Sequence, residues 1–159
     1  MEMIKDLKVL GQILALLIIG GAIGFAAGSR FGFKAGGFTT SSMEYSLSHH
    51  QLEVAFSEAD CQGVRDALTT YLAIVEKHKD NPNSAFSGTV AYADITLAQN
   101  RLARIARKLG DNDLSQKHLQ AAIESCGRAR WENCSELHIL AVSKRLEQEN
   151  PIKCLATEY

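Results

Sequence analysis

The sequence has none of the short motifs that mark the common classes of enzyme and metal site. It contains no G-x-S-x-G segment, no phosphate-binding loop, no H-E-x-x-H pattern and, despite four cysteines, no Cys-x-x-Cys pair. Asp94 stands beside an apolar helical stripe, but one carboxylate does not make a catalytic site. We therefore expect no enzyme activity, no cofactor and no metal site.

An excess of charge of one sign is also missing. The chain has 17 Lys and Arg residues and 18 Asp and Glu residues, which gives a formal net charge of −1. Domains that bind nucleic acid through its phosphates usually carry a clustered basic excess, so we expect no nucleic-acid partner. The 159 residues are enough for one modest globular unit in addition to a terminal segment.

Proline is scarce, and no stretch alternates apolar and polar residues as a strand does. Pro82 and Pro151 both lie at apparent helix boundaries, where proline is tolerated. The sequence therefore predicts an all-α domain over 43–150, followed by a C-terminal tail over 151–159. The helices are expected near 43–58, 61–79, 86–109, 112–126 and 134–148.

A long run without charge lies near the N-terminus. From Val9 to Ala27 only Gln12 interrupts the apolar residues. A helix of this length spans roughly 28 Å at ~1.5 Å per residue, close to the ~30 Å hydrocarbon core of a bilayer. We therefore expect a single transmembrane helix over 9–28, preceded by a short tail over 1–8. A cleaved signal peptide is the alternative, because the run follows a basic start and ends in small residues.

Glycine recurs at every fourth position, beginning inside the apolar run and continuing past it, at Gly20, Gly24, Gly28, Gly32 and Gly36. Residues four apart are neighbours on a helix face. Glycine leaves a shallow groove there, which lets another helix approach closely in lipid, a pattern known as a glycine zipper. The lipid-embedded contact face is expected to be Gly20, Gly24 and Gly28. Its partner is either an integral membrane protein complex or a second copy of the chain.

The segment over 29–42 is rich in Gly, Ser and Thr and predicts a linker, either a flexible tether or a continued helix. Its aromatic residues beside Arg30 and Lys34 suit contact with membrane lipid at the bilayer interface. The basic residues on the two sides of the apolar run balance, and the short N-terminal tail favours a cytoplasmic N-terminus. The apolar run is then a signal-anchor of a single-pass protein, and the helical domain is periplasmic or otherwise non-cytoplasmic.

The third predicted helix has the clearest amphipathic pattern. Its apolar residues alternate four and three positions apart and form one stripe: Ala91, Ile95, Ala98, Leu102, Ile105 and Leu109. Gly110 follows as a C-terminal stop, and Asp111 or Asn112 can cap the next helix. Small residues and short connections favour antiparallel neighbouring helices.

The stretch over 99–127 resembles one tetratricopeptide repeat, in which a tight turn joins two helices. The resemblance rests on Leu102-Ala103, Gly110-Asp111, Leu119 and Ala122-Ile123. It implies that Leu102, Ala103 and Ala122 pack the two helices together, and that Leu119 fills the space between helices. It also implies a small antiparallel helical-hairpin domain that binds a peptide or protein partner in a concave groove.

The sequence departs from the repeat at several positions. Gln99 and Ala106 stand where the repeat prefers Trp and Tyr. Ser115 stands where it prefers Ala, and Gly127 replaces the usual terminal Pro. The earlier helix pair, across Ala59-Asp60, has a similar outline with weaker residue agreement. A compact bundle of generic helical hairpins is therefore the alternative to a true repeat.

Four basic residues with no acid among them lie near the end of the third predicted helix: Arg101, Arg104, Arg107 and Lys108. Arg101, Arg104 and Lys108 share a face away from the apolar stripe. One explanation is that cations near a helix C-terminus interact favourably with the helix dipole. The functional hypothesis is a docking face for an acidic protein partner or for lipid headgroups.

The four cysteines are Cys61, Cys126, Cys134 and Cys154. Cys126 closes the fourth predicted helix and Cys134 opens the fifth, so a disulfide between them would staple that connection. Cys61 and Cys154 could pair next, which would tie the tail to the second helix. A non-cytoplasmic location permits both bonds. Four cysteines allow three complete pairings, and free thiols are a further alternative.

Together these patterns favour a non-enzymatic adaptor or accessory subunit of a membrane protein complex. The glycine face would pack within the bilayer, and the helical domain would bind a protein partner outside it. The alternative is a self-assembling homo-oligomeric membrane protein, in which the glycine face pairs with copies of itself. A pore is the weaker version of that alternative, because a single span with no intramembrane charge is poor evidence for conduction.

Overall fold

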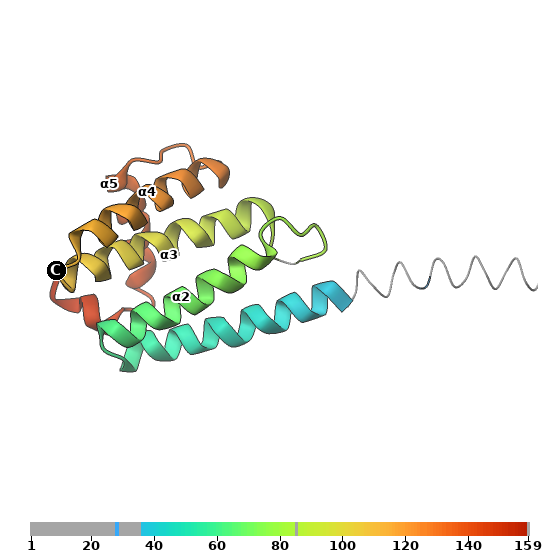
Figure 1. The fold of residues 1–159 in the computed structure, drawn as a ribbon, viewed down its shortest axis with the longest axis horizontal. Coiled ribbons are helices and arrows are strands. Elements are labelled where there is room, and N and C mark those ends of the chain that lie inside the picture. The colour runs from blue at the N-terminus through green and yellow to red at the C-terminus, as the bar shows by residue number, and fades with distance from the viewer. Residues whose placement is uncertain (1–27, 29–35, 85, 159) are drawn as a thin grey trace, which may run out of the picture. The chain divides into compact units, whose positions relative to one another are not determined.

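The fold is known from a computed structural model, which describes residue 28 and residues 36–84 and 86–158. Every regular element within these residues is a helix, and none is a strand (Figure 1). The predicted all-α fold class is therefore confirmed. The chain divides into two units, Met1–Gly37 and Phe38–Tyr159, and the second unit carries the fold and the candidate site.

The predicted membrane anchor lies outside the described residues. Of the segment over 9–28, which includes Gly20 and Gly24, the structure describes only Gly28. Among the described residues, no helix combines the length and the apolar character that crossing a bilayer requires. The membrane helix therefore stays a prediction that rests on the sequence.

Five helices and a short 3-10 segment make up the described part of the second unit. They are the 38–58 helix, α2 (Cys61–His78), α3 (Gly88–Lys108), α4 (Asn112–Arg128), α5 (Glu136–Glu147) and η1 (Lys153–Glu158). The bounds of α2 to α5 agree with the sequence predictions to within about two residues, the usual scatter of helix ends.

The first helix begins earlier than the sequence predicts. Residues 36–42 are helical, although their composition places them in the linker over 29–42. Of the two alternatives for the linker, residues 36–42 therefore follow the continued helix and not the flexible tether. The Ser41 hydroxyl donates to the Phe38 carbonyl at 3.0 Å, and Ser41 is buried. Tertiary packing thus outweighs the weak helix propensity of Ser and Thr.

Of the predicted C-terminal tail over 151–159, the structure describes residues 151–158, and this segment is part of the packed domain. Ile152 and Leu155 are buried in the hydrophobic core. A disulfide between Cys61 and Cys154 also ties η1 to the start of α2. Burying these two side chains removes apolar surface from water, which favours the packed position of the segment over a free tail.

The helices pack as antiparallel pairs (Figure 1). The start of the 38–58 helix lies beside the end of α2, where Glu44 accepts from Lys77 at 2.8 Å and lies 2.7 Å from His78. α3 contacts α2, α4 and α5, so it is the helix around which the others assemble.

A tight turn joins α3 to α4. Gly110 has a φ of 85°, and its N–H donates to the Arg107 carbonyl while the Asp111 N–H donates to the Ala106 carbonyl. This pair of bonds is the Schellman arrangement, which favours glycine at the left-handed position. The Asp111 carboxylate accepts from the Leu114 N–H at 3.0 Å and caps α4. The predicted glycine stop is confirmed, and Asp111 supplies the predicted cap.

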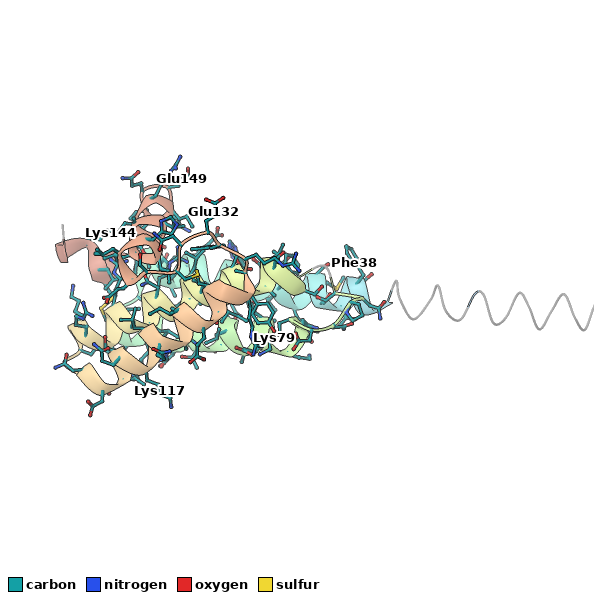
Figure 2. All side chains as sticks on the ribbon, turned by 90° about the horizontal axis from the view of Figure 1, so that it is seen from above. Phe38, Lys79, Lys117, Glu132, Lys144 and Glu149 are labelled. Atoms are coloured by element: carbon teal, nitrogen blue, oxygen red, sulfur yellow. A yellow bond between two sulfur atoms is a disulfide. The ribbon has the colours of Figure 1, made fainter. Side chains whose placement is uncertain are left out.

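One hydrophobic core runs between the helices. The predicted α3 stripe faces this core, and the exposed fraction is at most 2% at Ala91, Ile95, Ala98, Leu102 and Ile105. Leu109, the last predicted member, is exposed instead, because it is the C-cap residue at which α3 ends. Charged side chains such as Lys117 and Glu132 lie on the outside of the unit (Figure 2).

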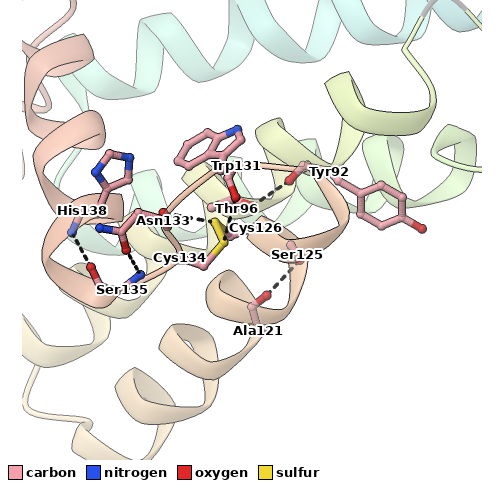
Figure 3. The surroundings of a disulfide bond; sticks show 10 residues. All are labelled: Tyr92, Thr96, Ala121, Ser125, Cys126, Trp131, Asn133, Cys134, Ser135 and His138. Atoms are coloured by element: carbon pink, nitrogen blue, oxygen red, sulfur yellow. Dashed lines mark hydrogen bonds between the residues drawn. A yellow bond between two sulfur atoms is a disulfide. The ribbon is translucent and has the colours of Figure 1, made fainter.

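Two disulfides fasten the domain. Cys126 and Cys134 are joined across the α4–α5 connection with their Cα atoms 5.6 Å apart (Figure 3), which is the predicted bond. Cys61 and Cys154 are joined with their Cα atoms 5.1 Å apart. The sequence allows three complete pairings of the four cysteines. The structure has the pairing that includes the shortest loop, between the neighbouring helices α4 and α5.

Candidate partner-binding pocket

The basic residues predicted as a docking face do not form one surface. Arg104 is almost fully buried, and its Nη1 donates to both carboxylate oxygens of Glu147 at 2.8 Å. Glu147 lies on α5, is also buried, and accepts from the Ser143 hydroxyl at 2.9 Å. The prediction that Arg104 faces outward is therefore wrong, because Arg104 is the cation that neutralises a buried carboxylate.

Arg101 is turned toward the same carboxylate. Its Nε lies 3.5 Å from Glu147 Oε1, and its guanidinium lies over the Phe56 ring, 5.3 Å from the ring centroid. Burial lowers the pKa of Arg101, and the negative charge of Glu147 opposes that shift. The spacing of Arg101 and Arg104 along α3 does not reveal this arrangement, because Glu147 follows Arg104 by 43 positions.

Arg107 and Lys108 are the members of the predicted basic set that remain on the surface. Arg107 Nη2 lies 3.6 Å from Glu136 Oε1. The ammonium group of Lys108 donates to the Cys154 carbonyl. These two cations are therefore held by contacts within the domain at the end of α3, and they do not extend a basic face along it.

A pocket of about 290 Å³ lies next to Arg101. The 38–58 helix, α2, α3 and the end of α5 all contribute to its wall, which includes Tyr45, His49, Phe56, Tyr71, Asp94 and Arg101. The aromatic rings supply apolar area, and the ionisable groups supply both signs of charge. Such a mixture of apolar wall and a few polar groups is typical of binding pockets.

A chain of hydrogen bonds runs along the wall of this pocket. The Tyr71 hydroxyl donates to the Tyr45 hydroxyl at 3.0 Å, and the Tyr45 hydroxyl donates to Asp94 Oδ2 at 3.0 Å. Burial raises the pKa of Asp94, although the two hydroxyl groups oppose that shift. Burial also raises the pKa of Tyr45 to about 12. Burial raises the pKa of Tyr71 as well, so both tyrosines stay protonated at neutral pH, and each donates its one hydroxyl proton within the chain.

Aromatic stacking holds the Tyr45 ring in place. The Phe86 ring stacks on it with the centroids 3.5 Å apart, and the His49 ring stacks at 5.9 Å. Phe86 comes from the connection between α2 and α3, so that connection folds back over the 38–58 helix. Tyr45 is thus fixed by two rings and by its hydrogen bonds, which orients the hydroxyl before any ligand arrives.

The pocket wall offers groups that can bind a ligand through charge, hydrogen bonds and apolar contact. The Asp94 carboxylate accepts hydrogen bonds, the Arg101 guanidinium carries a positive charge, and the rings offer flat apolar faces. Among the described residues there is no group of three or more His, Cys, Asp or Glu side chains placed to hold a metal ion. The wall therefore suits a ligand with polar and apolar parts, such as a segment of polypeptide.

The sequence contained only faint signals for this pocket. Asp94 is conspicuous as an acid beside the apolar α3 stripe, and Tyr71 belongs to the apolar pattern of α2. Tyr45 and Tyr71 are 26 positions apart, and Tyr45 and Asp94 are 49 apart. Helix periodicity identifies the faces of a single helix, so it does not predict contacts between residues that come from three different helices.

The residues that carry the tetratricopeptide resemblance lie away from the pocket wall. All four residues to which the resemblance assigns packing roles are buried: Leu102, Ala103, Leu119 and Ala122. Comparison of the chain with protein families, with characterised proteins and with solved structures finds no match. Kinship with tetratricopeptide repeats therefore stays a prediction.

Proposed function

We propose that the chain is a non-enzymatic, membrane-anchored adaptor or accessory subunit of a membrane protein complex, and that its pocket binds a segment of a protein partner. The pocket between the 38–58 helix, α2, α3 and the end of α5 carries this proposal, because it combines a carboxylate, a guanidinium and aromatic faces. These are the groups that recognise a polypeptide backbone together with a polar side chain.

The size of the pocket favours a peptide over a cofactor. At about 290 Å³ it lies at the lower end of the ~300–1,000 Å³ of small-molecule sites. One or two side chains of a partner would fill it.

The anchor half of the proposal rests on the apolar run from Val9 to Ala27 and on the glycine face of Gly20, Gly24 and Gly28. The two disulfides support a non-cytoplasmic location for the helical domain, because such bonds persist in oxidising compartments. In this arrangement the N-terminus is cytoplasmic and the domain meets its partner at the outer side of the membrane.

Co-purification tests the proposal. Tagged full-length chain is extracted from membranes, and the proteins that elute with it are identified by mass spectrometry. The pocket variant is His49→Trp, since His49 is half-exposed at the pocket wall and a larger ring there fills the space. The matched control is His138→Trp, at an exposed histidine on α5 outside the pocket.

We expect a partner at constant ratio with the wild-type chain and with His138→Trp, and at least a tenfold loss with His49→Trp. Equal recovery with both variants would show that the pocket is not the binding site. Recovery of the chain in the soluble fraction would contradict the membrane anchor but not the pocket as the binding site.

A further inference from the structure

The wall of the pocket carries more acidic than basic side chains. Its carboxylates come from three parts of the fold: Glu53 from the 38–58 helix, Asp94 from α3 and Glu149 from the residues that follow α5. Among the described residues that line the pocket, Arg101 is the one Lys or Arg. An excess of one sign of charge in a cleft favours a ligand of the opposite sign.

Asp94 is the carboxylate that lacks a close cation. It is partly buried, whereas Glu53 and Glu149 are exposed. Its Oδ2 accepts from the Tyr45 hydroxyl at 3.0 Å, but Asp94 forms no ion pair with any residue that the structure describes. Burial raises the pKa of Asp94, because the charged form is poorly solvated inside the domain. A cation in contact with the carboxylate would stabilise that charged form.

The basic groups of the wall are directed at other carboxylates. Arg101 Nε lies 3.5 Å from Glu147 Oε1, and His49 Nδ1 lies 3.6 Å from Glu53 Oε1. Burial has the largest effect on the pKa of Asp94, and the charges of His49 and Arg101 oppose that effect only through space. The wall therefore keeps an excess of negative charge at Asp94.

We propose that the pocket binds a cationic side chain of the partner segment, through the ammonium group of a Lys or the guanidinium group of an Arg. This inference rests on the proposed function, which makes the pocket the site of a polypeptide. The cation would lie against Asp94, where opposite charges attract at short range. An acidic side chain would instead meet the three carboxylates of the wall, and like charges at an interface suppress binding.

The apolar part of the wall suits the rest of such a side chain. Leu97 and Leu146 line the pocket together with the Phe56 and Tyr71 rings. Lys and Arg have long apolar stems, which pack along surfaces of this kind while the charged head reaches a polar group. One basic side chain can therefore use both the apolar area and the carboxylate.

Thiol labelling of the full-length chain in detergent tests the charge of the pocket. The four native cysteines are disulfide-bonded, so a methanethiosulfonate reagent reacts with an introduced thiol. Leu146→Cys places that thiol at the pocket wall, where Leu146 is 41% exposed. The matched control is Leu137→Cys, because Leu137 is exposed on the same helix outside the pocket. The measured quantity is the labelling rate of a cationic reagent divided by that of an anionic reagent of similar size.

We expect this ratio to be at least threefold higher for Leu146→Cys than for Leu137→Cys. Adding Asp94→Asn should lower the ratio at Leu146→Cys at least twofold, since it removes the charge while keeping an acceptor for the Tyr45 hydroxyl. Adding Asp66→Asn, at an exposed acid of α2 outside the pocket, should leave the ratio unchanged. Equal ratios at the two thiols, faster labelling by the anionic reagent, or a ratio unmoved by Asp94→Asn would overturn the proposal.

Protection of the same thiol tests binding itself. Capped lysine and capped arginine, each acetylated at the amine and amidated at the carboxyl group, should slow the labelling of Leu146→Cys by an uncharged reagent at millimolar concentration. Capped glutamate should not slow it. Protection by capped glutamate equal to that by the two basic compounds, or no protection by either basic compound, would contradict a cation site.

The outcomes separate this inference from the proposed function. If His49→Trp abolishes co-purification but the pocket favours the anionic reagent, the pocket binds the partner through other chemistry, and only the cation site is wrong. If the pocket favours cations but His49→Trp leaves co-purification unchanged, the cation site stands and the proposed role of the pocket is wrong.

Discussion

Arg104 Nη1 lies 2.8 Å from both carboxylate oxygens of Glu147, and both side chains are almost fully buried. This ion pair joins α3 to α5 across 43 positions of sequence. Glu147 also lies 3.5 Å from Arg101 Nε and accepts from the Ser143 hydroxyl. One carboxylate therefore faces two partly or fully buried guanidinium groups, and it joins α5 to α3.

Glu147→Gln should destabilise the domain strongly. The substitution removes the negative charge that faces Arg101 and Arg104, and breaking a buried ion pair in this way costs about 3–5 kcal/mol. Arg104→Met should cost less, because Glu147 keeps Arg101 as a partner. Thermal unfolding of the purified full-length variants, followed by circular dichroism, measures both losses. Equal stability of the two variants would contradict the unequal roles assigned here.

The same cluster shows where sequence reasoning succeeds and where it fails. Periodicity predicts the α3 stripe through Ile105, and local turn chemistry predicts Gly110 and Asp111, because these features depend on neighbours along one helix. Arg104 has the spacing of a surface cation, but a carboxylate 43 positions later determines its environment. The sequence leaves 36–42 open between a flexible tether and a continued helix for a related reason, since burial of Ser41 is a tertiary effect.

Arg130 provides a test of backbone strain. Its φ is 60°, in the left-handed region, and the bonds from Arg130 N–H to the Gly127 carbonyl and from Trp131 N–H to the Cys126 carbonyl end α4 as Gly110 ends α3. Glycine adopts this conformation without the ~1 kcal/mol penalty of other residues. Arg130→Gly should therefore raise the free energy of unfolding by about 0.5–1 kcal/mol.

The converse change completes that test. Gly110 has a φ of 85° and no heavy atom within 4 Å of the position that a Cβ would take, so Gly110→Ala introduces backbone strain without a clash. It should lower the free energy of unfolding by about 1 kcal/mol. Chemical denaturation of both variants beside the wild-type chain gives the two values. A loss of stability with Arg130→Gly would show that the arginine side chain outweighs the strain.

Asp94 should make stability depend on pH. Burial raises its pKa in the folded chain above the ordinary value of 3.8, so the folded state binds more protons than the unfolded state between these two values. Stability attributable to Asp94 then falls as pH rises through that interval and stays low above it. Asp94→Asn removes the titration while keeping an oxygen acceptor for Tyr45.

The midpoint of thermal unfolding, measured from pH 3 to pH 8, tests this dependence. Asp94→Asn should be more stable than the wild-type chain near neutral pH, and the gap should close below about pH 4. Asp66→Asn serves as the control, because Asp66 is exposed on α2. A gap that persists unchanged at low pH would mean that the carboxylate charge is not its cause.

The two disulfides should contribute unequally to stability. Cys61 and Cys154 are 93 positions apart, whereas Cys126 and Cys134 are 8 apart. Closing a longer loop removes more conformational entropy from the unfolded chain, and in that description the longer loop contributes about 2 kcal/mol more. Replacing Cys61 and Cys154 together by Ala should therefore lower the free energy of unfolding more than replacing Cys126 and Cys134. Chemical denaturation of the two double variants measures the difference, and a larger loss from the short loop would show that local geometry at the α4–α5 connection outweighs loop entropy.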